Sequence, residues 1–253
     1  MTATIVFPVM VGWILGSIVN YLSDSLPVRR RLTFPFCLNC LATFPLVNYA
    51  IWPRRCPVCS APRRSRTWII EILAIFSSIW LWKDPVQPLG YGLSLLLLTY
   101  FLLVIVIDIE QRLILHIVSI VGAFLGLWVG YLSHGLTSTL LGGAVGFLIM
   151  LALYLLGFFF INFIRRRRNV EMEGEALGFG DVNLGGVIGL SLGWPGVLMG
   201  IVLAVFLAGC ISLIYLIVAL IGRRYKPDLA IPYGPFLAIS TIVLIYFKDA
   251  FWG

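Results

Sequence analysis

The sequence predicts an all-α polytopic membrane protein with about eight transmembrane helices and a small four-cysteine, zinc-binding cytoplasmic domain between the first two. Composition indicates the class: 60% of the 253 residues are hydrophobic and 11% are charged, with a mean hydropathy of +1.02. A soluble domain carries about 25% charged residues. A helix needs about 20 apolar residues to cross the bilayer core. We predict spans over residues 4–22, 68–82, 90–107, 113–132, 137–161, 182–195, 197–221 and 231–247.

Lysine and arginine predict the orientation of these spans. With eight helices, 16 of the 18 basic residues fall in loops on one side, and only Lys83 and Lys248 fall on the other. Because basic loops stay in the cytoplasm, we expect both termini outside. The net charge of +7 then reflects the orientation of the helices in the membrane, and no nucleic-acid partner is predicted. We expect three parts: a first helix over 1–22, a cytoplasmic cysteine domain over 23–67, and a seven-helix membrane domain over 68–253.

Four cysteines in the long cytoplasmic loop predict a metal site. Cys37, Cys40, Cys56 and Cys59 form the pattern C-x2-C-x15-C-x2-C. Two such pairs can surround one tetrahedral ion, usually zinc, and the metal stabilises a loop too short to bury a large core. Four thiolates leave no open coordination position, so we predict structural zinc. The alternative is a set of redox-active or unpaired thiols.

Two acids at the cytoplasmic ends of predicted helices are the candidate catalytic residues. Asp108 ends the apolar run that begins at Leu93, and Asp181 follows Gly178-Phe179-Gly180. An acid at the membrane edge is costly and indicates a functional site. Two neighbouring carboxylates can share one proton, so that one activates water while the other polarises a peptide carbonyl. The pattern therefore predicts an intramembrane-type aspartic protease. Gly178 and Gly180 are assigned to its active-site loop, where glycine permits positive φ and close approach of substrate.

Each acid also has a structural interpretation. Asp181 is placed to N-cap a helix that begins at Val182, and Asp108 could be a solvated helix end beside Glu110 and Arg112. The two acids together, on one membrane face and with adjacent glycines, favour the catalytic interpretation. Glycines that recur every four residues, at 122, 126 and 130 and at 185, 189 and 193, predict close helix contacts.

The order of these segments resembles the type IV prepilin peptidases along nearly the whole chain. The resemblance rests on Gly16-Ser-Ile-Val-Asn20 with Leu26-Pro27, the two cysteine pairs, Arg66-Thr-Trp-Ile-Ile-Glu71, Ile107-Asp108-Ile-Glu110, Glu175-Ala-Leu-Gly178-Phe-Gly180-Asp181-Val and Pro232-Tyr-Gly234-Pro235. It implies cleavage of prepilin or pseudopilin precursors, after a Gly and before an apolar helix, at the cytoplasmic face of a prokaryotic inner membrane. It also implies N-methylation of the new N-terminus by S-adenosylmethionine.

The sequence departs from the family pattern at three positions. His116 follows Leu115 where the family has Pro-Asp, Asn183 stands in place of a lysine, and Arg54 in place of a glycine. Arg54 lies in the region that the family associates with methyl transfer, where its side chain would either fill a cofactor site or contact lipid phosphate. Two other functions stay open: a Gly-x-Gly-Asp membrane protease for other substrates, and a non-enzymatic scaffold or transport component.

Overall fold

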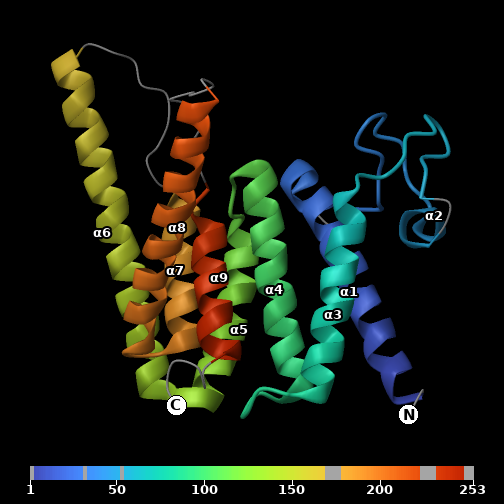
Figure 1. Ribbon diagram of the computed structural model, residues 1–253, viewed down its shortest axis with the longest axis horizontal. Helices are drawn as coiled ribbons and strands as arrows, with labels where there is room; N and C mark the ends of the chain where they lie inside the picture. Colours follow the sequence, from blue (N-terminus) through green and yellow to red (C-terminus); the bar gives the residue numbers. More distant parts are fainter. Residues whose placement is uncertain (1–2, 31–32, 52–53, 169–177, 223–231, 248–253) are drawn as a thin grey trace. The chain divides into compact units, whose positions relative to one another are not determined.

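The computed structural model describes residues 3–30, 33–51, 54–168, 178–222 and 232–247, without the side chains of residues 3, 4, 161 and 164–168 (Figure 1). Regular structure in these ranges is helical apart from two isolated β-bridges. The helices are α1 (Ala3–Arg29), α2 (Leu46–Ala50), α3 (Arg66–Lys83), α4 (Gly90–Gln111), α5 (His116–His134), α6 (Leu136–Arg168), α7 (Phe179–Leu192), α8 (Gly196–Ile221) and α9 (Gly234–Tyr246). The predicted all-α class is confirmed. The chain forms two compact units, Met1–Ile107 and Asp108–Gly253.

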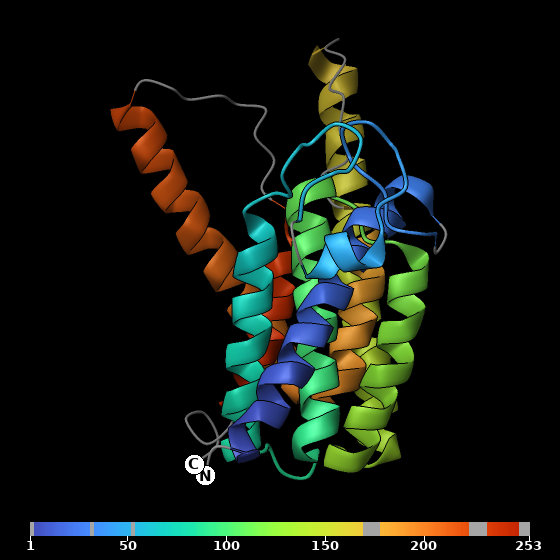
Figure 2. The same ribbon diagram turned by 90° about the vertical axis from the view of Figure 1, so that its right-hand side faces the viewer.

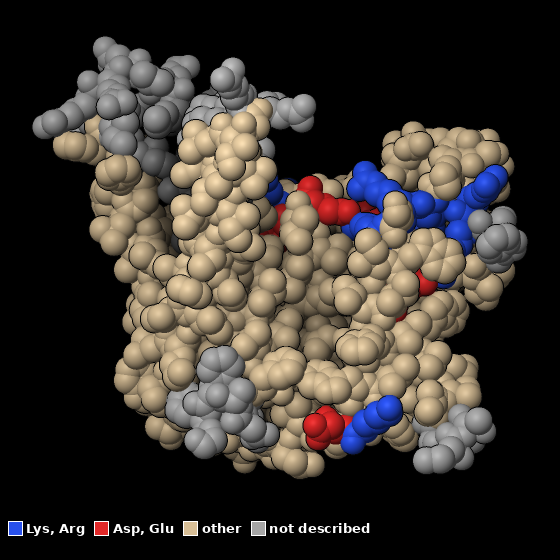
Figure 3. Space-filling model, viewed as in Figure 1, with Lys and Arg blue, Asp and Glu red and all other residues tan. Residues whose placement is uncertain are grey.

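Eight of these helices correspond to the eight predicted spans. Among the described residues, α1, α4, α5, α6 and α8 are long and apolar enough to cross a bilayer. Helices α7 and α9 are apolar but have only 14 and 13 residues, and α3 carries three charges in its 18 residues. On the face in Figure 3, Lys and Arg gather over the loop between α1 and α3, and most of the helix surface is uncharged.

Several helix ends differ from the predicted spans by three residues or more, and three of these differences bear on the fold. Helix α1 continues to Arg29 and α6 to Arg168, each beyond its apolar run, while α7 begins at Phe179 rather than at residue 182. Hydropathy locates the part of a helix that lies in lipid, whereas backbone hydrogen bonding continues into the polar ends. The earlier start of α7 matters most, because it places Asp181 inside the helix.

In the first unit, α1 and α3 run side by side in both views (Figures 1 and 2). Their contact depends on two glycines of α1. A Cβ on Gly12 would lie 2.6 Å from the Cα of Ile75, and one on Gly16 would lie 2.8 Å from the Cα of Glu71. Glycine at both positions lets the two helix backbones meet. This pair of glycines was not among the predicted helix contacts.

In the second unit, the short helix α7 contacts α5, α6, α8 and α9. The predicted glycine contacts are found at Gly126 and Gly130 of α5 and at Gly185 and Gly189 of α7. A Cβ on Gly126 would stand 2.9 Å from the carbonyl oxygen of Val187. Glycines of α6 complete the packing: Gly142 faces Gly189, and Gly146 faces Gly185. Helix α7 is therefore held backbone to backbone between two longer neighbours, with Asp181 at one end.

Candidate active site and metal centre

The second unit contains both predicted catalytic acids. Asp108 lies in the last turn of α4, and its side chain is buried. Asp181 is the third residue of α7 and is half-buried. The two carboxylates interact electrostatically. The fold thus brings together two acids that are 73 positions apart in the sequence.

The start of α9 surrounds Asp108. Gly234 is the first residue of α9, and a Cβ there would lie 2.6 Å from Asp108 Oδ2 and 3.3 Å from Ile114 Cδ1. Any residue larger than glycine would displace the carboxylate. The positive end of a helix dipole lies at its N-terminus, so α9 also favours negative charge at this position.

Asp181 also helps to begin its own helix. Its Oδ2 accepts a hydrogen bond from the Gly178 N–H at 3.2 Å, and its N–H donates to the Gly178 carbonyl at 3.0 Å. The alternative interpretation of Asp181 as an N-cap is wrong, because Gly178 is the N-cap and Asp181 lies three positions later. The two glycines also do not use the positive φ that glycine permits. Gly178 has a φ of −78°, and Gly180 is not among the glycines with positive φ.

Gly180 has a packing role instead. A Cβ there would lie 2.7 Å from Ile114 Cβ. An added Cβ on Gly234 would lie 3.3 Å from Ile114 Cδ1, so Ile114 is close to both Gly180 and Gly234.

Three buried polar atoms at this site have no hydrogen-bond partner within the described part of the chain: Asp108 Oδ2, Asp181 Oδ1 and the Tyr233 hydroxyl. Asp181 also interacts electrostatically with Tyr233. A buried polar atom without a partner costs about 1–3 kcal/mol, and a catalytic role, a bound water or an ion can each account for such an atom in a native protein. Sequence reasoning missed Tyr233, although it lies inside the quoted Pro-Tyr-Gly-Pro segment. Of the segment that precedes Asp181, residues 175–177 lie outside the described residues.

The four cysteines of the first unit form one cluster between α1 and α3. Their sulfur atoms all lie within 4.8 Å of one another. The Cys37–Cys59 and Cys40–Cys56 sulfur pairs are each 3.6 Å apart. Zn–S bonds of about 2.3 Å in a tetrahedron separate sulfurs by about 3.8 Å. The donor set and its spacing therefore fit a tetrahedral ion, and no disulfide links these cysteines.

Two equivalent turns build the cluster, 19 positions apart. Cys37 donates its N–H to Ala42 and Cys56 donates to Ala61, while β-bridges join Phe36 to Thr43 and Arg55 to Pro62. Leu41 and Ser60 occupy the same place in each turn with φ of 59° and 55°. The N–H groups of Cys59 and Val58 lower the pKa of the Cys56 thiol to about 6. These N–H groups therefore favour a thiolate at Cys56, the form that binds metal, whereas burial and the neighbouring thiols raise the pKa of Cys59.

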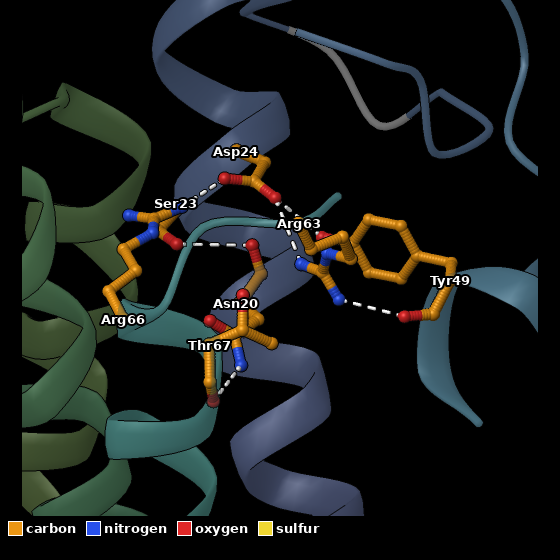
Figure 4. A network of polar contacts seen from close by, with 7 residues as sticks. All are labelled: Asn20, Ser23, Asp24, Tyr49, Arg63, Arg66 and Thr67. Carbon is orange, nitrogen blue, oxygen red and sulfur yellow. Dashed lines mark hydrogen bonds and ion pairs between the residues drawn. The ribbon is translucent and has the colours of Figure 1, made fainter. Parts of the chain in front are cut away.

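A carboxylate that sequence reasoning missed joins this loop to the end of α1. Asp24 accepts hydrogen bonds from Tyr49 at 2.7 Å and Arg63 at 3.1 Å, and forms an ion pair with Arg66 (Figure 4). Burial and the Asp24 charge raise the pKa of Tyr49, so its hydroxyl stays a donor. The available signal was an acid at the start of the 23–67 loop, which contains eight arginines. The adjoining cavity holds about 80 Å³ and is lined by Asp24, Tyr49 and Arg63 among others.

Arg54 is buried in a second ion pair of the first unit. Its Nη2 lies 2.8 Å from Glu71 Oε2 and 2.6 Å from the Ala50 carbonyl, and its guanidinium stacks over Trp68. The side-chain exposures of Arg54 and Glu71 are 8% and 4%. The suggested contact with lipid phosphate is therefore wrong, because Arg54 faces the protein. It links the end of α2 to α3.

The other two departures from the family pattern lie together in the second unit. His116, the first residue of α5, and Asn183, near the start of α7, line the same groove between α5, α6 and α7. Nothing in the sequence indicates that these positions are neighbours, since 66 residues separate them.

Comparisons with known proteins agree on one family. Residues 95–221 match the type IV leader peptidase family. The prepilin leader peptidase/N-methyltransferase of Aeromonas hydrophila is 28% identical over 230 residues, covering 87% of this chain and 72% of the relative. That of Pectobacterium carotovorum subsp. carotovorum is 28% identical, covering 92% and 89%. The type 4 prepilin-like proteins leader peptide-processing enzyme of Escherichia coli O78:H11 is 25% identical, covering 95% and 93%. No solved structure matches the chain.

Proposed function

Because this chain belongs to the type IV leader peptidase family, we propose that it is an aspartic endopeptidase that removes the leader from type IV prepilin-like precursors. Cleavage follows a Gly and precedes the apolar helix of the precursor. One observation carries the proposal. Asp108 and Asp181 interact electrostatically, and each keeps a buried oxygen atom without a partner in the described chain.

The two carboxylates perform the hydrolysis with one shared proton. The ionised carboxylate takes a proton from water as the water oxygen bonds to the peptide carbonyl carbon. The protonated carboxylate gives its proton to the carbonyl oxygen. The tetrahedral intermediate then breaks its C–N bond. The leaving nitrogen takes the proton that the first carboxylate had removed from water and becomes the new N-terminal amine, while one hydroxyl of the intermediate gives its proton to the other carboxylate and becomes the carbonyl of the leader's new carboxyl group. Because the carboxylates act as a pair, the apparent pKa values of the reaction belong to both.

The basic loops support a cytoplasmic location for this chemistry in a prokaryotic inner membrane. The turn at Asp108–Arg112 and the segment before Asp181 join the same side of the predicted topology as the cysteine loop. The side chains of Arg165–Arg168, and residues 223–226 and 248, lie outside the described residues. Zinc in the cysteine cluster is structural in this proposal, because all four coordination positions are thiolates. A zinc ion bound there would hold the two cysteine turns together.

Methyl transfer is a second activity, favoured by the names of the relatives. Several are named prepilin leader peptidase/N-methyltransferase, and S-adenosylmethionine is the expected donor. The cavity beside Asp24 holds about 80 Å³, whereas sites for ligands of this size hold roughly 300 Å³ or more. This cavity therefore does not fit the donor, and no step of the transfer is assigned to it.

One experiment tests both activities. The purified full-length chain in lipid vesicles is incubated with a prepilin precursor, with and without S-adenosylmethionine, and the products are analysed by mass spectrometry. We expect a mature chain that begins directly after the scissile Gly, and a mass increase of one methyl group only with the donor. Intact precursor at high enzyme concentration would contradict the peptidase and favour another substrate or a non-enzymatic role. Cleavage without any methylation would leave a peptidase alone.

A further inference from the structure

Tyr233, the residue that caps the start of α9, adjoins both acids of the candidate active site. A peptide bond joins it to Gly234, whose N–H interacts with the Asp108 carboxylate. A Cβ added to Gly234 would lie 2.6 Å from Asp108 Oδ2. The Tyr233 hydroxyl interacts electrostatically with Asp181. The backbone of Tyr233 is therefore held beside one acid, while its side chain reaches the field of the other.

The Tyr233 hydroxyl is buried and has no hydrogen-bond partner within the described part of the chain. Tyrosines at a membrane interface usually turn the hydroxyl toward water and headgroups, so a buried hydroxyl does not serve as such an anchor. Asp108 Oδ2 and Asp181 Oδ1 are buried in the same condition, and none of these three atoms is hydrogen-bonded to another. All three thus keep their hydrogen-bonding capacity for a group from outside the described chain.

Peptide hydrolysis at two carboxylates leaves a place for one more hydrogen-bond donor. The carbonyl oxygen of the scissile peptide has two lone pairs and gains negative charge as water attacks. In the proposed mechanism the protonated carboxylate donates to this oxygen, while the ionised carboxylate is an acceptor only. A tyrosine O–H is a donor at neutral pH, so Tyr233 can supply the second hydrogen bond.

We propose that Tyr233 is a third catalytic residue, whose hydroxyl donates a hydrogen bond to the carbonyl oxygen of the scissile peptide and stabilises the tetrahedral intermediate. The inference rests on the proposed function, which places this peptide at Asp108 and Asp181. The hydroxyl keeps its proton throughout, so the exchange of protons between water, peptide and the two carboxylates is unchanged. The role belongs to the oxygen atom of Tyr233 and not to its ring.

Removal of this oxygen atom alone tests the proposal. We expect Tyr233→Phe to lower kcat roughly a hundredfold, the effect of losing one donor to the developing oxyanion, while KM for the precursor stays unchanged. The unfolding temperature should not fall, because the substitution breaks no hydrogen bond of the described chain.

Tyr100→Phe is the matched control. The Tyr100 hydroxyl is also buried without a hydrogen-bond partner among the described residues, but it lies about two turns before Asp108 on α4. This variant should keep wild-type kcat. Wild-type kcat in Tyr233→Phe would overturn the proposal. A lower kcat accompanied by a lower unfolding temperature would also overturn it, because that pattern indicates a structural role.

Binding of a transition-state analogue gives a second test that does not depend on turnover. A precursor peptide with a difluoroketone in place of the scissile amide adds water and forms a diol that resembles the tetrahedral intermediate. We expect Tyr233→Phe to raise the Kd of this analogue roughly a hundredfold. The Kd of the intact precursor, measured in enzymes that carry Asp181→Asn to prevent cleavage, should be the same with and without Tyr233→Phe. An unchanged Kd for the analogue, or equal weakening of both ligands, would overturn the proposal.

The two proposals fail in different ways. If the wild type cleaves no precursor, the proposed function fails and the role of Tyr233 fails with it. If the wild type and Tyr233→Phe cleave the precursor at the same rate, the peptidase stands and the role of Tyr233 alone fails.

Discussion

Gly234 faces the carboxylate of Asp108 so closely that a Cβ on Gly234 would stand 2.6 Å from Asp108 Oδ2. The first residue of α9 therefore fixes where the carboxylate can lie. The requirement for glycine here comes from side-chain contact rather than from backbone conformation, since Gly234 does not have a positive φ.

We expect Gly234→Ala to lower kcat by roughly a hundredfold, because a displacement of about 1 Å in a catalytic group can cost this much. Gly209→Ala in α8 is the control, since nothing lies within 4 Å of its added Cβ. Cleavage assays on both variants at equal membrane content measure the effect. Wild-type kcat in Gly234→Ala would show that Asp108 does not act from this position.

Asp108→Asn and Asp181→Asn should each abolish cleavage, because an amide can neither share the proton nor take one from water. Expression should stay near normal. Asp84→Asn, at the exposed end of α3, is the matched control and should keep full activity. Either active-site variant that retained about a tenth of wild-type turnover would remove that residue from the pair.

The purified protein should carry about one zinc per chain, measured by elemental analysis. Cys56→Ser should lose it, while Cys210→Ser, outside the cluster, should not. Zinc replaces protons on the thiols, so its affinity should fall as pH falls. A metal-free protein with four titratable thiols and an intact fold would contradict the zinc site.

Arg54→Gln should destabilise the first unit by about 3 kcal/mol, because it leaves the Glu71 carboxylate buried without its charged partner. Arg55→Gln changes the neighbouring exposed arginine and should have little effect. Thermal unfolding followed through the Trp68 environment compares the two. Identical transitions would mean that the Arg54–Glu71 pair contributes nothing to stability.

Epitope tags inserted after residues 172 and 228 should be reached only from the cytoplasm, because these segments belong to the basic side of the predicted topology. A tag inserted after Val86, on the opposite side, should be reached from outside. Protease protection in intact cells measures from which side each tag is accessible. Outside access to residue 172 would move the active site to the wrong face.

The sequence was sufficient to predict elements that have a strong local signal. Apolar length predicts the helices, and the spacing of Cys37, Cys40, Cys56 and Cys59 predicts the cluster. Positions that depend on contacts between helices were not predictable in this way. The role of Asp24 requires knowing that Arg63 and Arg66 return to the end of α1. The burial of Arg54 requires knowing that Glu71 faces it.

Asp181 shows the same limit within one segment. Hydropathy starts the helix at Val182, but the hydrogen bonds that begin it run to Gly178. Helix α7 begins three residues earlier than hydropathy predicts, so Asp181 belongs to its first turn and does not cap it. Gly178 and Gly180 were assigned to a loop in which glycine permits positive φ and close approach of substrate. In the structure, Gly180 is instead needed because a side chain there would collide with Ile114.

The backbone contacts of α7 have a consequence for where loss of function can arise. Gly142 and Gly189 meet toward the far end of α7 from Asp181, eight residues and about 12 Å away. A larger residue at either position would push the whole helix aside, and the acid would move with it. Inactivating substitutions should therefore occur deep in the bilayer, at positions that touch neither water nor substrate.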